Sequence, residues 1–381
     1  MNAITLLQPP RLVFGNGCAA GCVELFAQRG VRRLLLVSSS PVLPQIGFLI
    51  EALQKAGCEV VQSRPVDSEP TREMFEQILA DAKPAGIEAV LGVGGGSPLD
   101  VAKLVAALVR GRQSVAEVFG IGLLEGRGLF LVCLPTTAGT GSEVSPNAIL
   151  LDEADELKKG VVSPHLVPDA AFVDPLLTLS VPAAVTAATG LDALTHCIEA
   201  YANKFAHPIT DQYALPGIRL ISANLLRAVR NGADAEARAN LALGSLYGGL
   251  CLGPVNTAAV HALAYPLGSR FKLAHGVSNA VLLPNVLRFN FSAAPKRYAE
   301  VAAALGVERG GPATVMAERG VERLAELSRA CGVPQRLSDF KIPRDAIPAL
   351  ARAAMQVTRL LKNNLRPVTE ADAAGIYEAT Y

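Results

Sequence analysis

The stretch Ala89-Val90-Leu91-Gly92-Val93-Gly94-Gly95-Gly96-Ser97-Pro98-Leu99-Asp100 decides the fold. Its apolar beginning predicts a buried strand, and a helix-like pattern follows from Ser97 to Arg110. The glycines between them allow positive φ and close approach of a ligand to the backbone. Ser97 as N-cap, Pro98 as the first helical residue and Asp100 as the third resemble a capping box. Free N–H groups at such a helix start favour an anion, although a plain strand-to-helix turn fits the same residues.

Strands and helices alternate on both sides of this loop. Further buried strands are expected at Arg33–Val37, Cys58–Val61 and Phe130–Leu134, and helices at 46–56 and 72–82. Strands separated by helices are typical of βαβ units in a doubly wound parallel sheet. After about Asp174-Pro175, Ala- and Leu-rich helical stretches dominate instead. We therefore expect an α/β dinucleotide-binding domain over 1–180 and an all-helical domain over 181–381, with the site in a cleft between them.

The composition excludes several classes of partner. Lys and Arg number 35 against 34 for Asp and Glu, and aromatic residues make up 5% with no Trp, which argues against nucleic acids and anionic membranes. The run from Ala239 to Ser269 carries no charged residue, but its Asn240, His261 and several glycines favour a buried helix–turn–helix over a membrane span. Seven scattered cysteines without a CxxC pair and the lack of a signal-like beginning favour a cytoplasmic protein.

A second polar loop follows the strand that ends at Pro135. It reads Pro135-Thr136-Thr137-Ala138-Gly139-Thr140-Gly141-Ser142-Glu143, and its hydroxyl groups suit phosphate or carboxamide oxygens. An ordinary polar loop would explain it as well. Because the carboxyl ends of parallel strands line one crevice, two such loops together favour a nucleotide.

The helical half contains a candidate metal site. Asp192 and His196 are four residues apart, which places both on one face of a helix. His261 lies in the uncharged segment, where an imidazole needs a partner, and His275 follows it. Three imidazoles and one carboxylate suit a divalent first-row metal with room for a substrate oxygen. Unrelated surface or core positions remain the alternative, because sequence separation does not show whether these side chains meet.

Four motifs together resemble the iron-containing (group III) alcohol dehydrogenases. They are GGGSPLDVAK (94–103), PTTAGTGSEV (135–144), GLDALTHCIEAY (190–201) and HALAYPLGSRFKLAHGVSNAVLLPNV (261–286). The resemblance extends from Phe14-Gly15 to the C-terminal tail. It implies the two-domain architecture shared with dehydroquinate synthase, with a nucleotide-binding α/β half and a helical, metal-binding half. It also implies a homodimer.

The resemblance assigns roles to individual residues. The implied metal ligands, which are also catalytic, are Asp192, His196, His261 and His275. The implied cofactor-binding residues, which hold the diphosphate or line the cofactor cleft, are Gly94, Gly95, Gly96, Ser97, Asp100, Thr136, Thr137, Thr140 and Lys158, with Lys159 as close a match as Lys158.

Two positions depart from the pattern of many family members. Ser39 stands where many have an Asp that binds the adenosine ribose, so NADP becomes possible beside NAD. Tyr265 stands where many have a further His, and a phenol is a poorer proton relay than an imidazole at neutral pH. Its hydroxyl could orient substrate or close the pocket, and a packing role fits as well.

The expected activity is hydride transfer between NAD or NADP and a small alcohol or aldehyde whose oxygen is bound to Fe(II), zinc or another divalent metal. A maleylacetate-reductase-like enzyme is one alternative. A dehydroquinate-synthase-like lyase that uses NAD transiently is another, although only Arg270 and Lys272 lie near the second ligand pair to hold a substrate phosphate. A non-enzymatic nucleotide- or metal-binding regulator is the third.

Overall fold

The computed structural model describes residues 3–381, and its contacts divide them into two compact units. The α/β unit comprises Leu6–Thr137 and Gly141–Leu179. The helical unit comprises Ser180–Tyr381 together with residues 3–5 and the short piece Ala138–Thr140. The loop after Pro135 thus contributes to both units.

The α/β unit is built on a six-stranded, fully parallel sheet in the order β1-β9-β6-β4-β2-β3. Its strands are β1 (Arg11–Phe14), β2 (Arg33–Val37), β3 (Glu59–Gln62), β4 (Ala89–Gly94), β6 (Phe130–Pro135) and β9 (Ala170–Val173). The chain runs outward from β2 to β3 and then returns to the other side of β2 with β4. The strand order therefore reverses between β2 and β4, where ligands bind in open α/β sheets.

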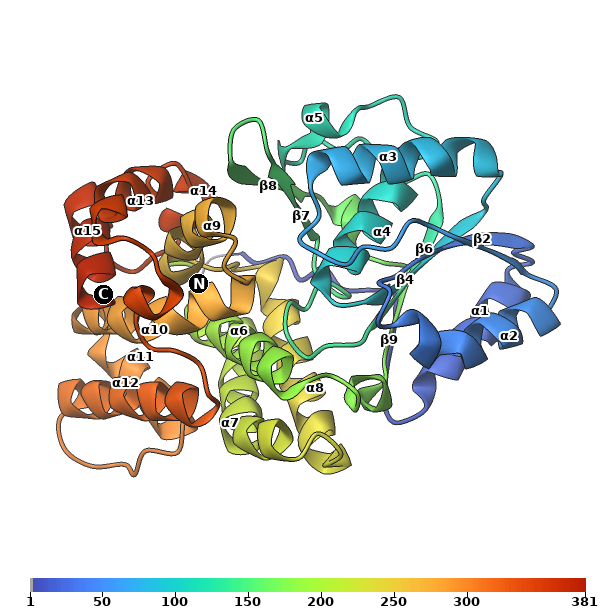
Figure 1. Ribbon diagram of the computed structural model, residues 1–381. Helices are drawn as coiled ribbons and strands as arrows, with labels where there is room; N and C mark the ends of the chain where they lie inside the picture. The colour runs from blue at the N-terminus through green and yellow to red at the C-terminus, as the bar shows by residue number, and fades with distance from the viewer. Residues whose placement is uncertain (1–2) are drawn as a thin grey trace. The chain divides into compact units, whose positions relative to one another are not determined.

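Helices cover both faces of this sheet, as the predicted doubly wound arrangement requires (Figure 1). Helices α1 (Gly21–Gln28) and α2 (Gly47–Lys55) share a core with Leu34 and Leu36 of β2. Helices α3 (Arg72–Ala82) and α4 (Gly96–Leu108) share another core with the alternate β2 residues, Leu35 and Val37. Successive side chains of a strand point to opposite faces, so a continuous apolar strand supplies both cores.

The start of α4 differs from the prediction. The helix begins at Gly96 with Gly95 as its N-cap, and no side chain caps it, so Ser97 is the second helical residue and not the N-cap. The glycine run lets the helix begin two residues earlier than the capping pattern suggested. The Asp100 carboxylate accepts hydrogen bonds from Ser142 Oγ and Ile149 N instead of closing a capping box.

A small second sheet was not predicted. It contains β5 (Gly120–Ile121), β8 (Leu157–Val162) and β7 (Asn147–Asp152), with β7 and β8 antiparallel, and a short helix α5 (Val115–Val118) precedes it. Every second residue of β7 is buried, beginning with Ala148. This period-two burial is typical of a half-buried strand, although the residues Ala148 to Leu151 are all apolar and do not show the alternation in the sequence.

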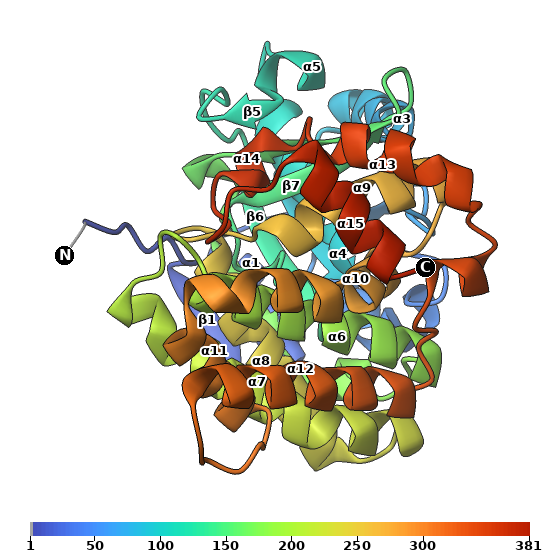
Figure 2. The ribbon, with the colours of Figure 1, turned by 90° about the vertical axis from the view of Figure 1, so that its left-hand side faces the viewer.

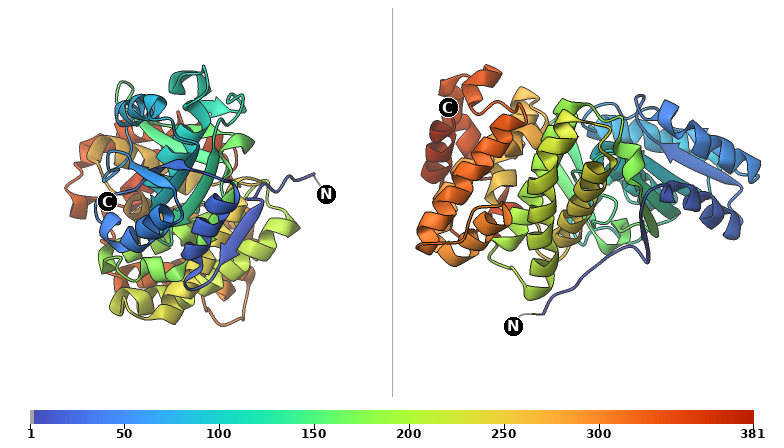
Figure 3. Two further views of the ribbon diagram at one scale, coloured as in Figure 1. Left: turned by 90° about the vertical axis from the view of Figure 1, so that its right-hand side faces the viewer. Right: turned by 90° about the horizontal axis from the view of Figure 1, so that it is seen from below.

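The second half of the chain is helical, as predicted (Figures 2 and 3). Its helices are α6 (Ala183–Tyr201), α7 (Pro208–Arg230), α8 (Ala235–Leu252), α9 (Ala259–Phe271), α10 (His275–Asn290), α11 (Pro295–Ala304), α12 (Ala313–Ala330), α13 (Ile347–Ala354), α14 (Thr358–Leu361) and α15 (Glu370–Ala379). Helix α6 packs against α7, α8 and α10 and is buried along nearly its whole length. It is therefore the central element on which a site in this unit is built.

The uncharged segment forms the predicted helix–turn–helix, because it spans the end of α8, a turn and most of α9. Within residues 3–381, no helix combines the length and the apolarity that crossing a membrane would require. Close helix contacts instead explain its small residues. A Cβ at Gly248 of α8, for example, would lie 3.2 Å from the Cβ of His196 on α6. Small residues let such helices approach closely and hold α6 in place.

Candidate metal centre and cofactor loops

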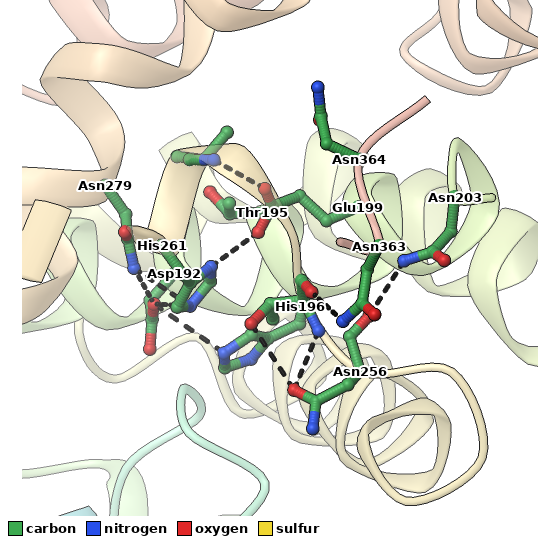
Figure 4. Close-up of polar contacts among 12 residues, drawn as sticks. Asp192, Thr195, His196, Glu199, Asn203, Asn256, His261, Asn279, Asn363 and Asn364 are labelled. Atoms are coloured by element: carbon green, nitrogen blue, oxygen red, sulfur yellow. Dashed lines mark hydrogen bonds and ion pairs between the residues drawn. The ribbon is translucent and has the colours of Figure 1, made fainter. Parts of the chain in front are cut away.

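Four side chains from three helices meet around one oxygen atom. Figure 4 shows three of them, Asp192, His196 and His261. Asp192 Oδ1 lies 3.8 Å from His196 Nε2, 3.5 Å from His261 Nε2 and 3.6 Å from His275 Nε2. Asp192 and His196 lie one turn apart on α6, His261 lies on α9, and His275 is the first residue of α10. The structure thus brings together the four residues that the family resemblance named as ligands.

The His261 ring lies close to the rings of the other two histidines. The rings of His196 and His261 are stacked, with centroids 4.8 Å apart and an interplanar angle of 18°, and His275 lies 5.2 Å from His261. Asp192, His196 and His261 are buried, whereas the His275 side chain is 30% exposed. The cluster therefore has one partly open side, at His275.

Electrostatics keep the carboxylate charged. Burial opposes ionisation of Asp192, but the surrounding imidazoles hold the pKa of its carboxyl far below the ordinary value. Burial also lowers the pKa of His196, against the opposing effect of Asp192. Burial alone would lower the pKa of His261 too, yet hydrogen bonds to Asp192 and Glu199 raise it to about 9. Metal binding requires the carboxylate ionised and the imidazoles neutral, so Asp192 is in the required state, whereas a cation would displace the proton that the raised pKa places on His261.

Sequence reasoning missed two side chains at this cluster. Asn279 is buried on α10, and its amide nitrogen lies 2.6 Å from Asp192 Oδ1 and 3.1 Å from His261 Nε2. Glu199 is buried on α6, and its Oε2 lies 2.6 Å from His261 Nδ1. Helical spacing could have revealed both, because Glu199 is seven residues after Asp192 and Asn279 is four after His275.

Tyr265 lies on the same face of α9 as His261, one turn further on. Its ring centroid is 6.1 Å from that of His275, and the residue is 9% exposed. This position, beside the partly open side of the cluster, is compatible with either role considered for it from the sequence. The remaining histidines lie elsewhere, since His207 caps the start of α7 and His165 belongs to the α/β unit.

The predicted phosphate loops end two neighbouring strands of the α/β unit. Strands β4 and β6 pair up to Gly94 and Pro135, and the Thr136 N–H then donates to the Gly94 carbonyl oxygen. A Cβ at Gly95 would lie 3.5 Å from Thr137 Oγ1. The first turn of α4 presents the backbone N–H groups of the glycine loop here, without a side-chain cap. Backbone donors and threonine hydroxyls thus gather at one edge of the sheet, the arrangement that binds a diphosphate.

The segment after β2 reaches the same edge. Ser38 Oγ donates to the Val93 carbonyl oxygen at 2.8 Å, and Ser39 follows it directly. Strand β2 is the neighbour of β4 on the other side from β6. Ser39 therefore lies where the strand order reverses, between β2 and β4. Thr140, by contrast, belongs to the helical unit.

Asp100 and the buried Lys103 tie α4 to the second loop. Lys103 Nζ donates to the Ser142 carbonyl oxygen at 2.8 Å and to Ser142 Oγ at 3.0 Å, and Asp100 accepts from the same hydroxyl. Burial raises the pKa of Asp100 and lowers that of Lys103, and each opposes the shift of the other. These contacts fix the backbone that carries the threonines.

The two candidate lysines have different surroundings. Lys158 is buried on β8 and forms an ion pair with Glu69, whereas Lys159 pairs with Asp152 and Asp155. The contact of either lysine with a cofactor stays a prediction.

Gly94→Ala should disable the first loop. Gly94 has φ of +158°, and an added Cβ would lie 2.7 Å from Pro98 Cγ and 2.9 Å from Pro98 Cβ. We expect roughly a tenfold or greater loss of cofactor affinity together with a loss of about 1–3 kcal/mol of stability from overpacking. Fluorescence titration with NADH and NADPH measures the cofactor affinity, and denaturant titration measures the stability. Gly47→Ala, where nothing lies within 4 Å of the added Cβ, is the control; equal affinities in both variants would contradict the assignment.

Glu143, at the end of the second loop, should make stability depend on pH. Burial raises the pKa of this carboxyl from 4.5 to about 7, against backbone hydrogen bonding and Lys103. Because the folded pKa is the higher one, the stability from the neutral carboxyl is complete below pH 4.5 and is lost as pH rises to about 7. Relative to the unsubstituted protein, Glu143→Gln should gain on the order of 3 kcal/mol in unfolding free energy between pH 4.5 and 8. Denaturant titrations of both proteins at the two pH values measure this gain. A difference in unfolding free energy that does not change with pH would contradict the prediction.

Comparison with known proteins identifies the family of the chain. Residues 9–175 match the family model for iron-containing alcohol dehydrogenase, and residues 186–381 match the model for the C-terminal part of the Fe-containing alcohol dehydrogenase family. The chain belongs to the iron-containing alcohol dehydrogenase family. Members of this family that match it are alcohol dehydrogenases and aldehyde reductases, so the chain is an oxidoreductase that acts on alcohols or the corresponding aldehydes.

Individual relatives cover the whole chain. Long-chain-alcohol dehydrogenase 1 of Geobacillus thermodenitrificans (strain NG80-2) is 41% identical over 388 residues, covering 100% of this chain and 98% of that protein. NAD-dependent methanol dehydrogenase of Bacillus methanolicus is 32% identical and covers 97% of each. The crystal structure of a 1,3-propanediol oxidoreductase superposes with a TM-score of 0.96 at 33% identity, over all of both chains. The two-domain fold and the family that were expected from the sequence are confirmed.

Proposed function

We propose that the chain is a metal-dependent, NAD(P)-linked alcohol dehydrogenase or aldehyde reductase that holds one divalent cation, expected to be Fe(II). The proposed ligands are Asp192, His196, His261 and His275. The observation that supports this most is the approach of three Nε2 atoms to within 3.5–3.8 Å of the same carboxylate oxygen. One anionic oxygen and three imidazole nitrogens in a buried setting fit a divalent first-row metal, zinc included.

A bound metal supplies a Lewis acid for the substrate oxygen, and a nicotinamide cofactor supplies or accepts the hydride. The protein's own side chains bind and orient both. Asp192 provides the negative charge that retains the cation, and the partly exposed His275 marks the side from which a substrate oxygen enters. Tyr265, next to His275, is proposed to orient that substrate.

The cofactor is proposed to lie at the edge of the α/β sheet. Gly94, Gly95, Gly96 and Ser97 would hold its diphosphate, with Thr136, Thr137, Thr140, Asp100 and Lys158 as further proposed contacts. The uncharged Ser39 lets both NAD and NADP bind, because no carboxylate there repels a 2′-phosphate. Relatives named for methanol and for long-chain alcohols leave the substrate size open, and the homodimer and cytoplasmic location stay predictions.

Metal analysis combined with a substrate panel tests this function. The full-length protein should carry about one divalent cation per chain and should oxidise NADH or NADPH stoichiometrically with at least one aldehyde. Chelation should abolish turnover, and adding Fe(II) back should restore it. Turnover that survives complete removal of the metal would overturn the proposal. Conversion of substrate without net consumption of cofactor would favour the lyase.

A further inference from the structure

Glu199 is a buried carboxylate directly behind the candidate metal centre. It lies on α6, one turn after His196, and is 5% exposed. Its Oε2 lies 2.6 Å from His261 Nδ1, and its Oε1 accepts a hydrogen bond from the Val260 N–H at 2.7 Å. Figure 4 shows Glu199 and Asp192 at opposite nitrogens of the His261 ring. Glu199 therefore contacts the imidazole on the side away from the other three proposed ligands.

The donors around Glu199 require a carboxylate. The Val260 N–H is fixed as a donor, and a carboxylate oxygen 2.6 Å from His261 Nδ1 places the proton on that nitrogen. With the Nδ1 proton held by Glu199, Nε2 is the nitrogen left to bind a cation, and it faces Asp192 at 3.5 Å. A glutamine would offer only one acceptor to these two N–H groups and would leave one of them unsatisfied in the protein interior.

We propose that Glu199 is a positioning residue for the metal centre, a role that rests on the proposed function. It fixes the tautomer and the orientation of His261 and increases the basicity of its Nε2, as carboxylates behind metal-binding histidines do. Glu199 is not itself a ligand, because both of its oxygens are engaged by N–H groups behind the ring. Together with Asp192 it supplies two negative charges, which balance one divalent cation in a buried site.

A purely structural role is the competing explanation. Val260 belongs to the first turn of α9, so a carboxylate there also satisfies a free N–H group at the start of that helix. Loss of such a cap would lower stability but would leave metal retention unchanged. Metal affinity and metal-site spectra therefore separate the two roles.

The test compares metal retention in the full-length protein loaded with Co²⁺ or Zn²⁺. A competing chelator is added stepwise, and retained metal and the visible spectrum of the Co²⁺ form are recorded for the unsubstituted protein and for Glu199→Gln. We expect roughly a 10–100-fold weaker metal affinity and an altered Co²⁺ spectrum in the variant. Tyr298→Phe is the matched control. Tyr298 is buried, and the negative charge of Glu199 helps burial to raise the pKa of the Tyr298 hydroxyl. Tyr298 is neither a proposed ligand nor a hydrogen-bond partner of one, so its substitution perturbs the same region without touching the metal centre.

Each outcome decides the proposal. Affinity within threefold of the unsubstituted protein and an unchanged spectrum would overturn the role of Glu199, even if stability falls. If Glu199→Gln does not fold, Glu199→Asp is used instead. The aspartate keeps the negative charge, but its shorter side chain cannot reach both the His261 Nδ1–H and the Val260 N–H. Undiminished metal affinity in Glu199→Asp would overturn the proposal. If the unsubstituted protein binds neither metal, the proposed function itself fails.

Discussion

Asp192→Asn is expected to abolish metal retention and turnover. The substitution preserves the size of the side chain but removes the one anion among the proposed ligands, at the point where three imidazoles converge. Because loss of a contact behind a ligand already costs roughly 10–100-fold in affinity, loss of the charged ligand should cost about 1000-fold or more. Aldehyde-dependent kcat/KM should fall by a similar factor. Elemental analysis after gel filtration and steady-state assays measure both effects.

Asp174→Asn is the matched control for this variant. Asp174 is also a buried carboxylate, and its oxygens accept hydrogen bonds from the backbone N–H groups of Gly17, Ala19 and Leu176 in the α/β unit. Its substitution should lower stability through the lost acceptor while leaving the metal content intact. Equal metal content in the two variants would contradict the assignment of Asp192.

Gly276→Ala should disrupt the metal centre through packing alone. Gly276 follows His275 at the start of α10, and an added Cβ would lie 2.2 Å from the carbonyl oxygen of Ala188 on α6. Backbone atoms cannot yield locally, so α10 must move away from α6 and carry His275 with it. We expect a loss of about 3 kcal/mol in unfolding free energy and at least tenfold weaker metal binding. Denaturant titration and chelator competition provide the measurements.

Gly375→Ala makes the same chemical change without the contact. Gly375 is exposed within α15, and nothing lies within 4 Å of an added Cβ. Because alanine favours helix over glycine, this variant should gain about 0.5–1 kcal/mol. A Gly276→Ala protein that is as stable and as metal-replete as Gly375→Ala would show that the α6–α10 contact does not fix the ligands.

Elements with strong apolar patterns were predictable from the sequence. Strand β2 and helix α3 begin and end where expected, because β2 is a continuous apolar run and the apolar residues of α3 recur at helical spacing. The β7–β8 hairpin was missed because β7 contains a continuous apolar run and β8 contains two adjacent lysines, so neither strand shows a clear alternation of residue types. At α4 the capping pattern was misleading, since Asp100 is used in a tertiary contact with Ser142.

The candidate site was predictable only in part. Helical spacing connects Asp192 with His196, but the approach of His261 and His275 depends on how α9 and α10 pack against α6. The sequence does not show how these helices pack, so only the family resemblance assigned all four residues to one site. The role of Glu199 also depends on this packing, because its partner His261 lies on α9, although its spacing from Asp192 already placed it on the same face of α6.

The most direct test of the metal centre is anomalous diffraction from crystals of the protein loaded with Fe(II) or Zn²⁺. Data collected at the absorption edge of the metal should show one strong peak per chain, at bonding distance of roughly 2.0–2.3 Å from Asp192 and from the Nε2 atoms of the three histidines. A peak away from these four side chains, or its absence in a metal-replete and active crystal, would contradict the account.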